Sequence, residues 1–147
     1  MAITQAVANS FKKQILEGGH KFQFSGGDNF KLALYVSTAT LNSTTTAYTA
    51  SGEVSASGAY TAGGGALVKP NPSTSVASGV AIVDFSDLSF TGVTLTARGA
   101  LIYNTSTANA AVAVLDFGSD KTATSGTFTI QFPSFTTSAA ILRIGNA

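Results

Sequence analysis

The carboxylates of this sequence cluster in two places only, each of them a pair of closely spaced aspartates. Carboxylate oxygens are the ligands that Ca²⁺ prefers. Asp84 and Asp87 follow one apolar segment, and Asp116 and Asp120 follow another. Neither pair has the spacing of an EF-hand loop or the additional acids that a tight calcium site needs. Aspartates at strand ends also accept hydrogen bonds from their own backbone in turns. We therefore expect both pairs to be structural and expect no metal site.

The remaining reactive groups are too few to build an active site. His20 lies between Gly19 and Lys21 in a predicted connection, and the sequence has no cysteine and no second histidine for a zinc site or a serine triad. The run Gly63–Gly65 lacks the Lys-Ser/Thr that follows in a phosphate-binding loop. We expect His20 to lie at the surface or in a turn. We predict that the protein is not an enzyme and has no catalytic or cofactor-binding residues and no cofactor.

The charge balance limits the kinds of partner. The net charge is +1, and only 10% of the 147 residues are charged, so no long-range field attracts nucleic acid or an anionic membrane. Four lysines make the N-terminal segment mildly basic, without the dense stripe of a nucleic-acid interface; they are Lys12, Lys13, Lys21 and Lys31. The low charge predicts that copies of the chain or partners cover much of the surface. A small domain with a Ser/Thr-coated exterior is the alternative.

No segment reads as a signal peptide or a membrane span. Lys12, Lys13 and Glu17 interrupt any apolar stretch in the first twenty residues. The longest apolar runs, such as residues 110–115, are far shorter than the roughly 20 residues that cross a bilayer. The absence of cysteine indicates synthesis in a reducing cytoplasm, or an assembly that contacts rather than crosslinks stabilise.

The N-terminal segment has the apolar spacing of a helix. Its apolar residues recur every four positions, at Ile3, Val7, Phe11 and Ile15. This predicts a helix over about residues 4–17, with Thr4 as the N-cap and Gly18 and Gly19 as the stop. The helix either covers the open end of its own β-fold or reaches onto a neighbouring subunit.

From about residue 22 onward the pattern indicates strands. Residues 30–36 alternate with a period of two, and Pro70 and Pro72 prevent a central strand over 69–72. Further strands are expected at 66–68, 80–85, 93–103, 112–117, 128–132 and 140–144. The stretches 37–46, 55–65 and 71–79 read as long surface loops.

Seven or eight short strands and one helix predict a single domain over residues 1–147. The β-domain spans about residues 22–147. The fold class is all-β, an antiparallel β-sandwich or barrel of jelly-roll or immunoglobulin-like type with one N-terminal α-helix.

Segments along most of the chain resemble a family of small structural proteins of tailed bacteriophages. Residues 1–6 with Phe11 and Lys12 resemble the family's opening helix, and residues 30–35 and 37–41 resemble its first strand. The most distinctive match combines residues 46–49, 52–54 and 60–64. Residues 97–104, 113–118 and 128–132 complete the pattern. Residues 56–59 depart from it by lengthening a turn.

The resemblance implies a virion structural protein without catalytic residues. Chain length, β-content and low charge are similar to those of capsid decoration (cement) proteins, which sit on the capsid exterior, often as trimers. The expected partners are the major capsid protein and further copies of the chain in a homotrimer. A tail or other virion component is the alternative within this class. A carbohydrate-binding module is the alternative from another class, and it would need exposed aromatic residues or several loop acids.

Overall fold

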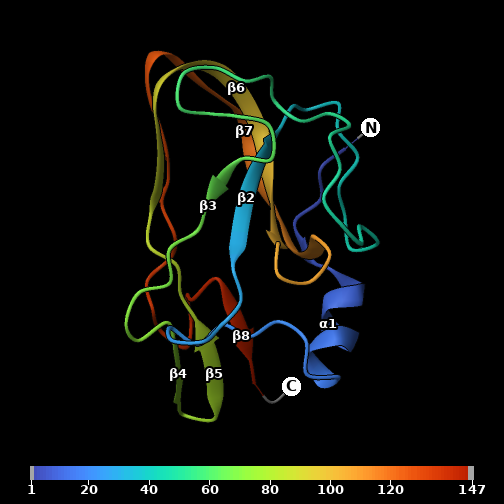
Figure 1. Ribbon diagram of the computed structural model, residues 1–147, viewed down its shortest axis with the longest axis vertical. Helices are drawn as coiled ribbons and strands as arrows, with labels where there is room; N and C mark the ends of the chain where they lie inside the picture. The colour runs from blue at the N-terminus through green and yellow to red at the C-terminus, as the bar shows by residue number, and fades with distance from the viewer. Residues whose placement is uncertain (1, 146–147) are drawn as a thin grey trace.

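The computed structural model describes residues 2–145 and contains two antiparallel β-sheets and one short helix, α1 (Figure 1). The predicted all-β fold with one N-terminal helix is therefore confirmed. The larger sheet has the order β1-β7-β6-β2-β3, and the smaller sheet has the order β4-β5-β8. The larger sheet consists of β1 (Ala6–Val7), β2 (Phe30–Tyr35), β3 (Gly65–Ala66), β6 (Leu88–Asn104) and β7 (Ala110–Ile130). The smaller sheet consists of β4 (Thr74–Ala77), β5 (Val80–Val83) and β8 (Leu142–Ile144).

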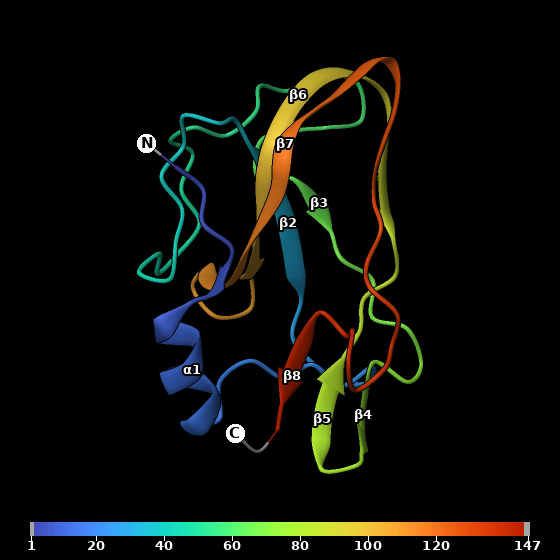
Figure 2. The ribbon, with the colours of Figure 1, turned by 180° about the vertical axis from the view of Figure 1, so that it is seen from behind.

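One long hairpin, β6–β7, forms most of the larger sheet. The sequence predicted separate strands at 93–103, 112–117 and 128–132, and the structure joins the last two into β7. The pairing of the hairpin shifts register at several points, one of them between Ala97 and Gly99. Such irregularities bend strands and increase their twist. The hairpin accordingly curves over at one end of the molecule, so that its two halves lie on different sides (Figures 1 and 2).

Gly99 lies where the N-terminal segment passes close to the hairpin. A Cβ atom at Gly99 would lie 2.4 Å from the carbonyl oxygen of Leu115 and 2.9 Å from Cγ2 of Ile3. These distances are shorter than van der Waals contact. The N-terminal segment and the hairpin therefore approach each other closely because position 99 is glycine.

The two halves of the hairpin differ in environment. In the half next to β2, residues 99–104 pair with residues 30–35, and both faces are buried. In the other half, Phe90 packs edge-on against Tyr60 with ring centroids 5.0 Å apart. The outer face of that half carries cross-strand hydroxyl pairs, Ser89 with Thr129 at 2.9 Å and Thr96 with Thr122 at 2.8 Å. This half therefore alternates between a buried face and a Thr-rich face.

The predicted start of the helix is wrong. The helix α1 spans Asn9–Leu16, its N-cap residue is Ala8, and no side chain caps it. Residues 6 and 7 instead form β1, which pairs with Val114 and Ala113. Thr4 donates its backbone N–H to the carbonyl of Leu41 at 2.9 Å rather than capping the helix. The end was predicted correctly, since the helix stops before Gly18, whose φ of +85° an L-residue rarely adopts.

One predicted surface loop contains a strand. Residues 71–79 were expected to be irregular, but they include β4, which pairs with β5. All four residues of β4 are exposed, so no apolar alternation marks the strand in the sequence. Residues 37–46 run without a regular strand, as expected, and the loop expected over 55–65 does so up to Gly65, where β3 begins. In the part of the chain that the structure describes, no helix is long and apolar enough to span a membrane.

Candidate functional site

The aspartate pairs do not form a common site. Asp116 accepts a hydrogen bond from the backbone N–H of Gly118 at 2.9 Å, as predicted for a turn, and contacts Arg98 Nε at 3.2 Å. The Gly118 hydrogen bond, with help from Arg98, lowers the pKa of the Asp116 carboxyl. Asp87 differs from the prediction, since it accepts the backbone N–H of the distant Phe132 at 2.8 Å. Asp120 makes no side-chain hydrogen bond or ion pair within residues 2–145.

Asp84 lies between β5 and β6 and is half-buried. Its partial burial raises the pKa of its carboxyl. No group of three or more His, Asp or Glu side chains within residues 2–145 is arranged to hold a metal ion. The structural role of the aspartate pairs thus has direct geometric support at Asp116 and Asp87.

His20 is buried, which corrects the expectation of a surface position. Only 4% of the residue is exposed, and it lies in the irregular connection that follows α1, with φ of 64°. Its ring lies against Phe11 with centroids 4.8 Å apart. The connection between α1 and β2 therefore turns inward and places its imidazole in the core.

A chain of hydrogen bonds runs through this imidazole from Gln14 to Asp28. Nε2 lies 2.7 Å from Oε1 of Gln14, and Nδ1 lies 3.1 Å from the amide nitrogen of Asn104. The same amide nitrogen donates to Asp28 at 2.8 Å. Because Nδ1 faces a donor, the geometry fits a neutral imidazole that accepts at Nδ1 and donates at Nε2. Protonation would place an N–H against the amide N–H₂.

The pKa values agree with this assignment. Burial lowers the pKa of His20, and the negative charge of Asp28 only partly offsets it. Burial also acts to raise the pKa of Asp28, but hydrogen bonds from Asn104 and from the backbone of Lys21 outweigh this and leave the pKa lowered. Both ring nitrogens of His20 are thus engaged within the protein.

All four tyrosines lie around Glu53, which the sequence analysis did not foresee. The carboxylate of Glu53 accepts hydrogen bonds from Tyr48 Oη at 2.5 Å, from Tyr60 Oη at 2.8 Å and from the backbone N–H of Gly63 at 2.7 Å. Tyr103 donates its hydroxyl to the carbonyl of Gly63 at 2.5 Å. We call these residues, together with Tyr35, the tyrosine–glutamate cluster.

The cluster attaches an irregular segment to the larger sheet. Tyr60 also accepts the backbone N–H of Leu34 in β2 at 2.8 Å, and Tyr35 donates to the carbonyl of Thr49 at 2.7 Å. The hydrogen bond to Glu53, followed by burial, raises the pKa of Tyr48 to about 12. Burial, followed by the charge of Glu53, raises the pKa of Tyr35 and of Tyr103, and burial also raises that of Tyr60. These hydroxyls are structural hydrogen-bond donors rather than acids or bases.

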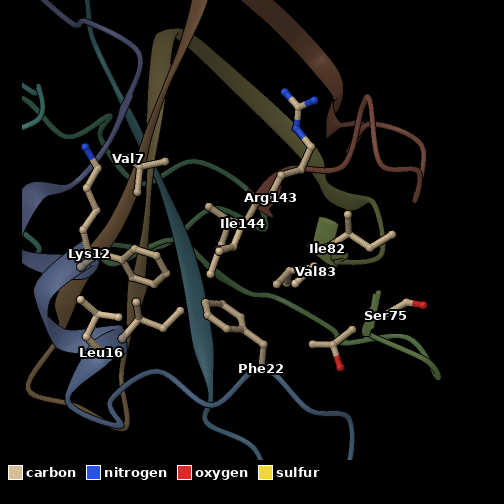
Figure 3. A pocket seen from close by; sticks show the side chains of 14 residues that line it. Val7, Lys12, Leu16, Phe22, Ser75, Ile82, Val83, Arg143 and Ile144 are labelled. Carbon is tan, nitrogen blue, oxygen red and sulfur yellow. The ribbon is translucent and has the colours of Figure 1, made fainter. Parts of the chain in front are cut away.

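A groove of about 400 Å³ lies between α1 and the smaller sheet (Figure 3). Phe11 and Phe22 contribute to its lining from one side, and Ile82 and Leu142 contribute from β5 and β8. Each of these four residues is at most 6% exposed. The rim carries Leu16, which is 89% exposed. We call this feature the apolar groove, and it brings together segments that are more than 60 residues apart in the sequence.

The features described above share one property, the use of their titratable groups within the fold. Among residues 2–145, the buried titratable groups are engaged in hydrogen bonds that hold the fold, and the apolar groove contains no carboxylate, histidine or hydroxyl–base pair. In comparisons with family models, curated proteins and solved structures, no match to the chain is found.

Proposed function

We propose that the protein is a structural component of a tailed-phage virion, a decoration protein on the capsid exterior that stabilises the shell of the major capsid protein. The observation that carries this proposal is the resemblance to small phage structural proteins over most of the chain. The structural features are in keeping with it, because the protein's reactive groups serve its own fold. The proposed role is mechanical and requires no catalytic residues, cofactor, nucleic acid or membrane.

The surface supports attachment through repeated contacts of modest size. A net charge of +1 provides little electrostatic steering, so binding must rely on shape-complementary contact. Three large apolar side chains are exposed outside the apolar groove, at Phe24, Val68 and Val76. A homotrimer that contacts several capsid subunits would multiply weak contacts into tight attachment. The low charge and these exposed side chains favour self-association.

A carbohydrate-binding module is less well supported. Stacking on a sugar requires exposed aromatic faces, and Tyr35, Tyr60 and Tyr103 are each at most 3% exposed. The half-buried Tyr48 is stacked on Tyr103. Among the described residues, Phe24 is the one large aromatic side chain that is exposed, and 53% of the residue is accessible to solvent. A single exposed ring is a poor platform for an oligosaccharide. A tail component stays the second candidate, because the resemblance does not separate capsid from tail.

A deletion and add-back experiment tests the proposal. Particles of the phage that encodes the chain, prepared without it, should lose infectivity at lower temperature than complete particles. Adding the purified chain should restore heat resistance and saturate at a fixed ratio to the major capsid protein. Particles that assemble normally, resist heat equally and fail to bind the added chain would contradict a decorating role. Tail-less particles after the deletion would favour the tail alternative.

A further inference from the structure

The apolar groove is built mostly from side chains that cannot hydrogen-bond a ligand. All but four of its 14 lining residues are apolar; the exceptions are Lys12, Thr74, Ser75 and Arg143. The volume of about 400 Å³ lies in the range of small-molecule sites, which is about 300–1,000 Å³. Leu16 and Ile144 extend the apolar surface outward, since they are 89% and 58% exposed. The groove therefore presents a continuous apolar surface from floor to rim.

Two cations flank one end of this groove. Figure 3 shows Lys12 of α1 and Arg143 of β8 extending toward the same end of the view, on either side of Val7. No carboxylate lines the groove, and within residues 2–145 neither cation has an ion-pair partner. Arg143 donates Nη1 to the carbonyl of Ser138 at 2.8 Å, which fixes the guanidinium and leaves Nε and Nη2 available. The end of the groove is therefore positively charged and partly preorganised.

The lining discriminates between possible occupants. An extended peptide would find hydrogen-bonding partners at the free edge of β8 but few on the α1 side of the groove, and burying unpaired polar groups is unfavourable. A second copy that docked groove to groove would bring two more cations and no lining carboxylate to pair with them. A saturated hydrocarbon chain has no polar groups to satisfy. An anionic head group would meet the cations at the charged end.

From this combination we infer that the apolar groove is a binding site for a single-chain amphiphile with an anionic head group, of the alkyl carboxylate class. The hydrocarbon chain lies along Phe11, Ile82 and Leu142, and the carboxylate lies at the end of the groove toward which Lys12 and Arg143 extend. Each methylene that the groove covers strengthens binding by up to about fourfold, so affinity rises with chain length. This site stands apart from the proposed virion role, and neither depends on the other.

Titration of the ¹⁵N-labelled protein with sodium octanoate, decanoate and dodecanoate, each below its micelle concentration, tests the site. Amide resonances of α1, β5 and β8 should shift saturably, and affinity should rise from the eight-carbon to the twelve-carbon chain. Butyrate, which has the head group without the chain, should cause no saturable shift. Dodecyltrimethylammonium, which has the same chain with a cationic head, should bind at least tenfold more weakly than dodecanoate.

Neutralising substitutions test whether Lys12 and Arg143 themselves, rather than the net charge of the protein, attract the anionic head group. Lys12→Gln and Arg143→Gln should each weaken dodecanoate binding by about two- to fivefold, as for exposed ion pairs. The matched control Lys13→Gln makes the same charge change one residue along α1, outside the lining, and should leave affinity within twofold. Leu16→Glu alters an exposed rim residue, so it should weaken binding by at least fivefold while the amide spectrum stays that of a folded protein.

Three results would overturn the inference. The first is the absence of saturable shifts with dodecanoate. The second is equal affinity for the anionic and cationic chains, or equal effects of Lys12→Gln and Lys13→Gln. The third is a dilution-dependent shift of groove amides without any amphiphile, which would assign the groove to a second copy of the chain.

Discussion

Replacing Glu53 by alanine should destabilise the fold far more than a half-exposed glutamate normally does. The substitution removes the acceptor for the hydroxyls of Tyr48 and Tyr60 and for the N–H of Gly63. A hydrogen bond to a charged group contributes about 1.5–3 kcal/mol. Glu53 is only half-buried, and the three bonds share one carboxylate, so their losses overlap. We expect a total loss of about 3 kcal/mol.

Chemical denaturation monitored by circular dichroism measures this loss, and thermal unfolding should show a Tm lower by roughly 6–12 °C for a chain of this size. The sequence supplies its own control, because Glu17 is the other glutamate. Glu17 pairs with Lys13 at the surface, and Glu17→Ala should change stability by less than about 0.5 kcal/mol. Tyr48→Phe should cost less than Glu53→Ala, and its effect should largely vanish in the double variant.

An unfolding free energy for Glu53→Ala within about 0.5 kcal/mol of the unsubstituted protein would refute the reasoning. So would additive effects of Glu53→Ala and Tyr48→Phe, since two residues of one network must couple. Either result would mean that the tyrosine–glutamate cluster does not hold the irregular segment to the sheet.

Three further predictions follow from burial and pKa. The tyrosines should resist ionisation in the native state, so the tyrosinate absorbance at 295 nm near pH 10.5 should be small before denaturation and large after it. The stabilisation that their neutral hydroxyls contribute is complete below about pH 10. It is lost as the pH rises toward the pKa of Tyr48, about 12. A native titration near pH 10 would contradict this. In acid, the unfolded chain protonates His20 below about pH 6.5, whereas the lowered pKa of the folded chain keeps the imidazole neutral to a lower pH. Stability should therefore fall as the pH drops below about 6.5. His20→Gln should flatten this fall, and an unchanged slope would count against the assignment. Phe11→Ala should cost about 3–5 kcal/mol because Phe11 is 5% exposed, and a loss below about 1 kcal/mol in denaturant titration would place the helix outside the core.

The parts of the fold that were predictable are those with a local cause. Strand β2 was found because its residues alternate, and Gly18 marked the end of α1 through its backbone conformation. Pro70 and Pro72 correctly excluded a strand between β3 and β4. Turns and buried strands of this kind depend on residues close together in the sequence.

The errors arose where distant contacts decide the local structure. Ile3 and Val7 have helical spacing to Phe11, but residues 6 and 7 pair with β7 more than 100 residues away. Strand β4 exposes all its residues and is held by pairing with β5. Neither contact leaves a periodic signal in the sequence.

The candidate sites were hidden for the same reason. The four tyrosines have no common spacing, and they meet around Glu53 because an irregular segment returns to β2 and β6. The burial of His20 depends on Asn104 in β6, 84 residues away. The apolar groove combines α1 with β5 and β8. The aspartate pairs attracted attention through sequence proximity, but their partners include Arg98 and Phe132 on other segments.

The central claim, a decorating role on the capsid, is tested most directly by the number of copies of the chain in purified virions. Quantitative gel densitometry or mass spectrometry against the major capsid protein provides this number. A shell protein that binds by repeated contacts should be present in hundreds of copies, in a fixed ratio to the capsid subunits. A count of about 3, 6 or 12 copies, or absence from the particle, would contradict the decorating role.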